Sequence, residues 1–395
     1  MLAKRFLCLA AAVLAPAAAS EAQGSVELPP YVQAYEPRSV DERGLWMEAD
    51  QYEKALKISE LLVNDEQLVG YIRQILCDTV GKDRCNGVRI YVADIPAFNA
   101  TMSPNGLMVV WSGLLLRARS EAEVGAVLGH EFAHFEQRHS LKGFQARRKA
   151  TNVLAWVQVL GGIAQTDTRN TQTTIIGSFF QFNREQEKEA DILGLKYLAY
   201  SRYPSRAASE VWQHLMEEND ATLYGRNLKK RQRYTAGFFD THPTELARAD
   251  YLLNESLKLG GTGNAEVKRY YEKLTPYLPR LLKSQIRLND LHGTDYILNG
   301  IAATTGWTGT LLAARAEMYA TRGEPRDLVT ATTLYLNALD AGYRDPSTLR
   351  GLGLSLIKSG KRKEGVTYIQ EYLKLLPDAQ DATVMRMYLP KPENN

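Results

Sequence analysis

Residues 121–139 read EAEVGAVLGHEFAHFEQRH. Acidic side chains occupy the first turn of this segment, and Arg138 and His139 occupy the last, an order of charge that complements a helix dipole. We therefore predict one helix of about five turns. Apolar residues lie on two of its sides, so the helix is expected to pack centrally, between a sheet and other helices.

Two histidines on this helix form the most informative pair in the chain. At about 100° per residue, His130 and His134 project from one face, one turn apart, so both rings can reach a metal ion at about 2.0–2.1 Å. Glu131 projects beside that point, where a general base for water belongs. The alternative is a pair of core histidines, and a third ligand decides between the two interpretations.

The third ligand is expected in residues 184–198, REQEKEADILGLKYL, which are predicted to form another helix. Glu187 and Asp191 lie on the stripe of small and apolar residues that should face the interior, whereas Glu185 and Glu189 point to the opposite, solvated side. Burying two carboxylates without a positive partner is costly, so a cation is expected opposite them. The alternative is a solvated acidic face paired with neighbouring basic residues.

One zinc ion per chain, bound by His130, His134 and Glu187, would compensate these charges. It would leave a fourth position open, which is the arrangement of a catalytic and not a structural zinc site. Asp191 would then accept a ring N–H from one of the two histidines.

Four motifs carry a resemblance to a known family: the run NGLMVVWSGLL from Asn105, HEFAH at 130–134, EKEAD at 187–191, and His242-Pro243. Together they resemble the gluzincin metallopeptidases of peptidase family 48, over roughly residues 45–255. That family includes membrane-embedded HtpX-like enzymes, CAAX prenyl proteases and periplasmic BepA-like enzymes with a TPR domain. The resemblance implies the ligand set given above, with Glu131 as the base and Asp191 supporting a ligand.

The resemblance also implies a role for His242. In similar enzymes a His-Pro pair at this place approaches the metal, where it stabilises the tetrahedral oxyanion or occupies the open position at rest. Arg248, about two turns further along the same predicted helix, is expected to assist. The alternative is that His242 only begins a helix.

The N-terminus has the pattern of a cleaved signal peptide, predicted over residues 1–20, with two basic residues, a short apolar run and then small residues. This predicts a periplasmic protein. The alternative is a membrane anchor, for which the apolar run is too short. Residues 21–45, rich in proline and charge, are predicted to be an extended arm.

Two of the three cysteines, Cys77 and Cys85, remain after cleavage. A close pair in an exported protein predicts a disulfide, with two free buried thiols as the alternative.

The formal charge of +3 falls to about +1 when the two basic residues of the signal peptide are lost. A nearly neutral chain produces no strong positive electrostatic field that would attract nucleic acid.

The most apolar later segment, 150–164, is shorter than a membrane span, so we expect no transmembrane helix in the mature chain and leave peripheral membrane contact open.

The predicted fold class is mainly helical α+β: a zincin-type metallopeptidase domain with a small sheet over residues 46–258, then an all-α domain. Residues 88–92 alternate like a strand, and 107–111 form a second strand. The second is expected to lie along the active cleft and to align substrate by backbone pairing, with a plain core strand as the alternative. Residues 265–390 contain segments that align at an offset of 37 and resemble irregular TPR units, which dock protein segments.

These features predict an exported zinc endopeptidase that hydrolyses peptide bonds of misfolded or misassembled envelope proteins. Its TPR-like repeats would dock clients or outer-membrane assembly proteins. The alternative function is a chaperone or assembly factor in which proteolysis is latent or secondary.

Overall fold

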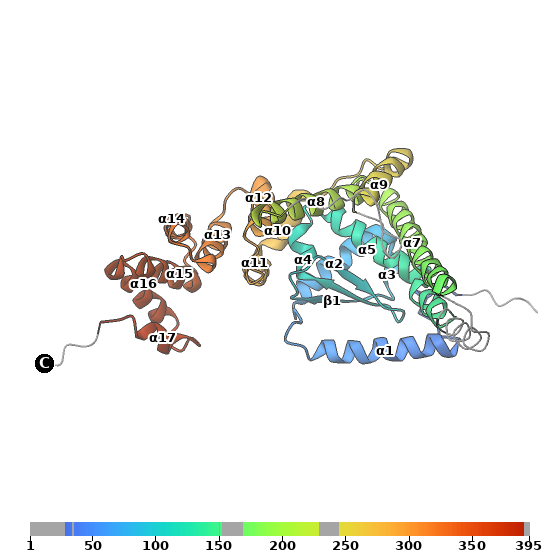
Figure 1. The fold of residues 1–395 in the computed structure, drawn as a ribbon, viewed down its shortest axis with the longest axis horizontal. Coiled ribbons are helices and arrows are strands. Elements are labelled where there is room, and N and C mark those ends of the chain that lie inside the picture. Colours follow the sequence, from blue (N-terminus) through green and yellow to red (C-terminus); the bar gives the residue numbers. More distant parts are fainter. Residues whose placement is uncertain (1–27, 34, 150, 152–168, 229–244, 391–395) are drawn as a thin grey trace, which may run out of the picture.

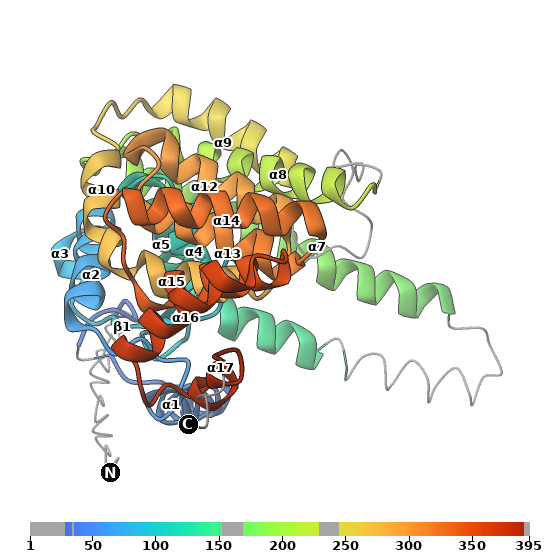
Figure 2. The ribbon, with the colours of Figure 1, turned by 90° about the vertical axis from the view of Figure 1, so that its left-hand side faces the viewer.

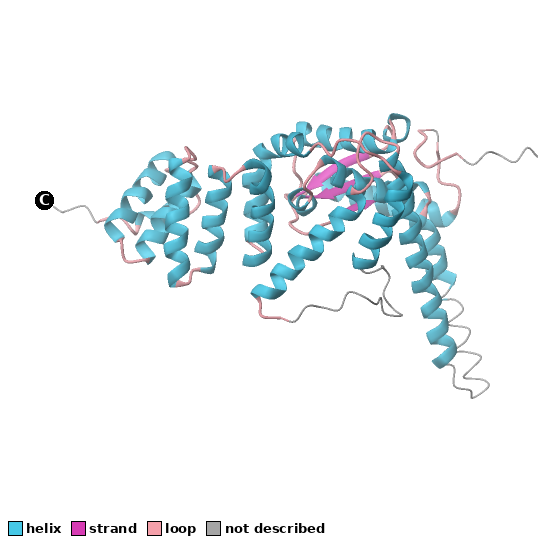
Figure 3. Cartoon of the chain, turned by 90° about the horizontal axis from the view of Figure 1, so that it is seen from above, coloured by secondary structure: helices cyan, strands magenta, loops and turns pink. Residues whose placement is uncertain are grey.

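The computed structural model describes residues 28–390 except 34, 150, 152–168 and 229–244. Helices make up most of this part, and one small sheet lies among them (Figures 1 and 3). The predicted fold class, mainly helical α+β, is confirmed. The predicted signal peptide and most of the apolar segment 150–164 lie outside the described residues. None of the described helices combines the length and apolar character needed to cross a membrane.

The sheet has three short strands in the order β1-β3-β2: β1 Arg89–Ala93, β2 Ala100–Met102 and β3 Leu107–Trp111. Strand β3 pairs in parallel with β1 and antiparallel with β2. The strand expected along the cleft, 107–111, is therefore the central strand, and four of its five residues are buried. Strand β2 occupies the edge instead. Its three residues are too few for an alternating pattern to stand out from the sequence.

The sheet is covered on both faces because its side chains alternate between two apolar clusters. Met108 and Val110 belong to the main core, together with helices α2 (Glu66–Val80) and α5 (Glu121–Glu136). Leu107 and Val109 point the other way, toward Leu56 of helix α1 (Val40–Lys57). Figure 1 shows α1 on the opposite side of the sheet from α5.

Helix α1 begins inside the segment predicted to be an extended arm. Its N-cap is Ser39, whose hydroxyl accepts a hydrogen bond from the backbone N–H of Glu42 at 3.1 Å. Asp41 and Glu42 lie in its first turn, where acidic side chains favour the helix dipole. The prediction was therefore wrong from Val40 onward, because the capping residues outweigh the proline-rich composition before them.

Helix α5 occupies the centre of the fold, as predicted, but it is shorter than predicted. Ser120 caps it by accepting from the N–H of Glu123 at 3.1 Å, and most of its residues are buried. It ends at Glu136, and Arg138 then adopts a left-handed conformation with φ 53°. Residues 139–149 are helical again.

Cys77 and Cys85 form a disulfide, as predicted. The bridge joins the end of α2 to the short helix α3 (Lys82–Cys85). Helix α2 packs against the central helix α5. By fixing the last turn of α2, the disulfide stabilises a helix on which α5 rests.

A long helix, α7 (Arg169–Ala199), packs along α5, and Figure 2 shows that its first part projects beyond the other helices. Further helices continue the same apolar core past residue 258, through Tyr270, Leu281 and Leu298. The domain boundaries at 258 and 265 remain predictions. Besides the elements already described and the C-terminal helix pairs, the structure contains these further helices: α4 Ser112–Arg117, α8 Ala207–Gly225, α9 Glu245–Leu259, α10 Val267–Leu274, a 3-10 turn Thr275–Tyr277, α11 Leu278–Ile286 and α12 Leu291–Thr305.

The C-terminal helices form two consecutive pairs, which lie at the end of the molecule opposite α7 (Figure 1). In each pair the helices pack against one another, and both helices of the second pair begin 37 residues after their counterparts in the first. This spacing equals the offset found in the sequence. The pairs are α13 Gly309–Arg322 with α14 Pro325–Asp340, and α15 Pro346–Lys358 with α16 Arg362–Leu375, followed by α17 Ala382–Arg386.

Candidate metal centre

Helix α5 presents His130 and His134 one turn apart, and their rings meet over a common point. The two Nε2 atoms are 3.1 Å apart. Both rings are half-buried. The helical spacing therefore produces the pair of metal-facing nitrogens expected from the sequence.

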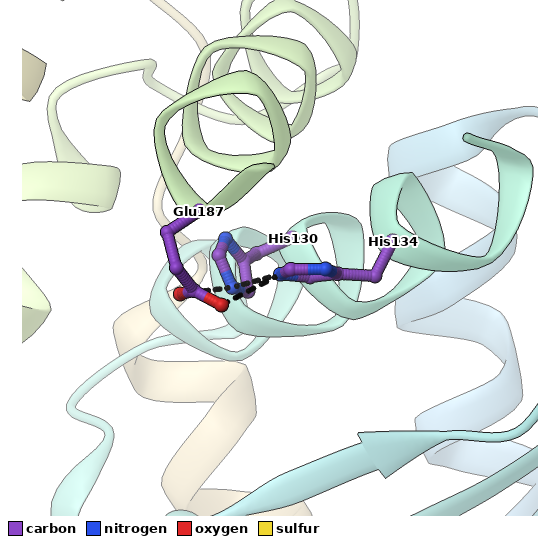
Figure 4. Close-up of side chains that lie close together, drawn as sticks. All are labelled: His130, His134 and Glu187. Carbon is purple, nitrogen blue, oxygen red and sulfur yellow. Dashed lines mark hydrogen bonds and ion pairs between the residues drawn. The ribbon is translucent and has the colours of Figure 1, made fainter. Parts of the chain in front are cut away.

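Glu187 reaches the same point from α7, as Figure 4 shows. Its two carboxylate oxygens lie 3.4 Å from Nε2 of His134 and 3.7 Å from Nε2 of His130. One ligand atom from each of the three residues lies within 4.8 Å of the others. The structure thus brings together the three side chains predicted to bind metal.

This approach depends on a glycine where α7 crosses α5. A Cβ on Gly194 would lie 2.9 Å from the backbone N of His130, closer than real Cβ contacts allow. The missing side chain lets the two backbones meet, so that Glu187, two turns earlier on α7, comes within reach of the histidines.

The spacing of the three side chains fits a zinc ion. Ligands about 2.0–2.1 Å from a tetrahedral zinc lie about 3.3–3.4 Å from one another. The separations of 3.1, 3.4 and 3.7 Å found here are scattered around that value. Two imidazoles and one carboxylate are also a donor set that zinc prefers, so the residues present fit the metal that the sequence predicts.

Behind His130 lies a buried ionic group. Nδ1 of His130 is 2.8 Å from Oδ1 of Asp191, and Nε of Arg248 donates to Oδ2 of Asp191 at 2.9 Å. The Tyr251 hydroxyl donates to the same carboxylate. Burial alone would raise the pKa of Asp191, but Arg248 and the bond from His130 outweigh burial and hold that pKa well below its usual range. Asp191 is therefore a carboxylate, and it accepts the ring N–H of His130.

Glu131 lines the pocket beside the three ligand side chains. Burial raises the pKa of Glu131 to about 7 in the protein without metal. Burial also lowers the pKa of His134 to about 3, which keeps this imidazole neutral at pH 7 with a lone pair for metal. A carboxyl group whose pKa is near neutral can both accept and donate a proton.

The pocket has a volume of about 440 Å³ and is bounded by the edge strand β2 on one side and by α8 and α9 on the other. Residues 99–102 of the β2 segment line it, as do Trp212 and Arg248. The indole of Trp212 lies over the guanidinium of Arg248, with Cζ 3.8 Å from the ring centre.

The structure also shows which site residues the sequence did not assign correctly or at all. Arg248, expected at the oxyanion, binds Asp191 and also lines the pocket; its catalytic role stays a prediction. His139 was assigned no role, yet its Nδ1 lies 3.0 Å from Nδ1 of His134. The sequence did not indicate this contact, because in the continuous helix predicted over 121–139 the side chain of His139 would point away from His134. His242 lies outside the described residues.

The profile of peptidase family M48 matches residues 75–256. These residues are a peptidase family M48 domain. The M48 domain contains all the site residues named above.

Three relatives support the assignment. The chain is 28% identical over 225 residues to the putative beta-barrel assembly-enhancing protease of Vibrio cholerae, covering 54% of this chain and 45% of the relative. It is 25% identical over 182 residues to the beta-barrel assembly-enhancing protease of Escherichia coli, covering 43% and 37%. It is 30% identical over 202 residues to the mitochondrial metalloendopeptidase OMA1 of Homo sapiens, covering 46% and 36%. The chain thus spans less than half the length of these relatives.

Proposed function

We propose that this chain is an exported zinc endopeptidase that hydrolyses peptide bonds of misfolded or misassembled envelope proteins. The main support is the convergence of His130, His134 and Glu187 at the spacing of zinc ligands, inside a pocket bounded by an edge strand. A bound zinc ion supplies a Lewis acid that polarises the scissile carbonyl and acidifies a water molecule.

Glu131 is the proposed general base and acid. It lies next to the ligand His130 in the chain and lines the same pocket. Its carboxylate would accept a proton from the attacking water and then deliver that proton to the nitrogen of the leaving amine. Arg248 lines the pocket as a positive group, and His242 is proposed to join it in stabilising the oxyanion.

The outer edge of β2, which pairs with no other strand among the described residues, is the proposed site for the substrate backbone. The backbone carbonyl of Asn99 accepts from the N–H of Trp111, and the backbone N–H of Ser103 donates to the carbonyl of Leu107. The backbone N–H and C=O groups of alternate residues 99, 101 and 103 therefore point toward β3. Because strand residues alternate, the N–H and C=O groups of Ala100 and Met102 point away from β3. A peptide can pair with these groups while its scissile bond lies beside the metal.

The proposal of envelope substrates and of the periplasm rests on the likeness to beta-barrel assembly-enhancing proteases, together with the predicted signal peptide. The repeated helix pairs α13–α16 are proposed to dock clients or outer-membrane assembly proteins, as TPR-like repeats do. One zinc ion per chain completes the proposal.

Replacing Glu131 with Gln tests the catalytic assignment. The variant should bind as much zinc as the wild type, because Glu131 is not a ligand, and it should cleave casein at least 100-fold more slowly. Zinc content is measured by atomic absorption, and Glu187→Ala, which should lose the metal, is the matched control. Cleavage by the Glu131→Gln protein at the wild-type rate would refute the assignment.

The repeated helix pairs also favour a second candidate function, a chaperone or assembly factor in which proteolysis is secondary. Rescue of envelope assembly by the Glu131→Gln protein separates the two. Equal rescue by variant and wild type would support the chaperone, and loss of rescue would support the protease.

A further inference from the structure

His139 reaches the metal centre because the central helix breaks before it. In a continuous helix, a side chain five positions after His134 would point about 140° away from it. Instead α5 ends at Glu136, Arg138 takes a positive φ of 53°, and a new helix begins at residue 139. A left-handed conformation costs a non-glycine residue about 1 kcal/mol. Arg138 therefore keeps it only because surrounding contacts hold the break in this form.

The break is held in place by contacts with the N-terminal segment and with α7. Arg138 donates from Nη2 to the carbonyl of Leu28 at 2.9 Å, and its guanidinium lies 4.6 Å from the ring centre of Tyr35. The carbonyl of His139 accepts from the Gln186 side chain at 3.5 Å. These contacts offset the cost of the left-handed residue.

The break places His139 behind His134. The two Nδ1 atoms are 3.0 Å apart, and the rings meet edge to face with their centres 4.9 Å apart. His139 is only 4% exposed. Its other nitrogen, Nε2, is 3.3 Å from a carboxylate oxygen of Glu189 on α7.

These contacts allow one consistent arrangement of protons for metal binding. Nε2 of His134 must carry a lone pair to bind metal, so its Nδ1 carries the hydrogen and needs an acceptor. Nδ1 of His139 is that acceptor. The hydrogen of His139 then lies on Nε2 and is donated to Glu189.

We propose that His139 is a positioning residue for the metal ligand His134, oriented in turn by Glu189. The pair His139–Glu189 would do for His134 what Asp191 does directly for His130, namely fix the tautomer and the ring plane. The proposal rests on the proposed metal centre and adds to it two residues with no assigned role.

Zinc affinity tests the proposal, measured by competition with a colorimetric chelator. We expect His139→Ala to weaken zinc binding about 10- to 100-fold, the usual effect of removing such a support. His139→Gln should recover most of the affinity, because its amide can accept from His134 and donate to Glu189. His214→Ala is the matched control: that histidine also contacts a carboxylate, 3.3 Å away on Glu123, but lies outside the pocket lining, so its loss should leave affinity unchanged.

Zinc affinity of His139→Ala within twofold of the wild type would overturn the proposal. The proposal would also be overturned if His139→Gln and His139→Ala lost the same amount of zinc affinity while both zinc-free variants melted at the wild-type temperature. If both variants fail to fold, Glu189→Ala tests the same contact from its outer end, since that side chain is 52% exposed; an affinity loss of several-fold supports the proposal and no loss refutes it. Failure of the wild type itself to bind zinc would instead refute the metal centre.

Discussion

Nε of Arg248 donates to Oδ2 of Asp191 over 2.9 Å, while the other oxygen of that carboxylate lies 2.8 Å from Nδ1 of His130. Both ionic side chains are buried, and the Trp212 indole covers the guanidinium. The positive charge of Arg248 therefore keeps Asp191 ionised, and the ionised carboxylate orients His130. An arginine predicted to act on substrate thus also supports the metal ligand.

Replacing Arg248 with Met should destabilise the zinc-free protein by about 3–5 kcal/mol, because the buried carboxylate of Asp191 is left without its partner. Thermal unfolding followed by circular dichroism measures the effect. The double variant Asp191→Asn, Arg248→Met removes both charges and should regain part of the loss. If the single and double variants melt at the same temperature, the two residues are not energetically coupled.

Gly194→Ala should separate α7 from α5. Alanine normally stabilises a helix interior by about 1 kcal/mol relative to glycine, but here its Cβ would lie 2.9 Å from the backbone of His130. Since backbone cannot yield locally, α7 must shift and carry Glu187 with it. We expect a loss of about 1–3 kcal/mol in stability and a zinc affinity more than tenfold weaker.

The matched control is Gly70→Ala in α2, where an added Cβ would meet nothing within 4 Å. This variant should keep its zinc affinity and gain up to about 1 kcal/mol. Unchanged zinc binding in Gly194→Ala would show that the close approach of the two helices is not needed for the metal centre.

Ala100→Pro should impair substrate binding without unfolding the sheet. The N–H of Ala100 points away from β3, so proline at this edge position removes a group offered to substrate and no bond of the sheet. Losing one such hydrogen bond should lower kcat/KM for a peptide about tenfold. Ala100→Ser, which keeps the N–H, serves as the control.

Thr101→Pro provides the contrast. Its N–H faces β3, so proline there breaks the pairing and should lower the melting temperature, unlike Ala100→Pro. A wild-type kcat/KM in the folded Ala100→Pro protein would contradict the proposed substrate strand.

Periodicity alone predicted the elements that meet at the metal. Helical phase put His130 and His134 on one face, and the same argument turned Glu187 and Asp191 inward on α7. These are local properties of a single helix, which a sequence displays directly. The bounds of the strand 107–111 were also predicted correctly, but it is the central strand of the sheet and not the strand along the cleft.

The remainder depends on contacts between elements, which no single segment encodes. The salt bridge of Arg248 joins α9 to α7, and the helix phase of either one says nothing about the partner. Glu189 was expected to face solvent, and it is 52% exposed, yet the left-handed Arg138 brings His139 to it. A strand of three residues such as β2 shows no period and is recognised only once β3 is in place.

Because of Glu53, the free energy of unfolding of the protein should depend on pH in the acidic range. Its carboxylate accepts from Arg89 at 2.7 Å and from the Tyr91 hydroxyl at 2.8 Å, which ties α1 to β1. The hydrogen bond from Arg89 lowers the pKa of Glu53 to about 2, from an ordinary value of 4.5. The folded state therefore binds fewer protons than the unfolded state between these values, so the stabilisation is complete above pH 4.5 and is lost as the pH falls toward 2.

Glu53→Gln should therefore cost stability at pH 7 and a little under half as much at pH 3, where part of the stabilisation remains. The pKa shift corresponds to at most about 3 kcal/mol, and we expect about 1–2 kcal/mol because Arg89 is 43% exposed and solvent screens its charge. Urea unfolding of α1 and the sheet, followed by tryptophan fluorescence at both pH values, measures the difference. Glu272→Gln, which alters an exposed pair with Lys268, is the control and should change stability by less than about 0.5 kcal/mol at either pH. An equal cost of Glu53→Gln at pH 7 and pH 3 would show that packing, and not the charge of Glu53, holds α1 against the sheet.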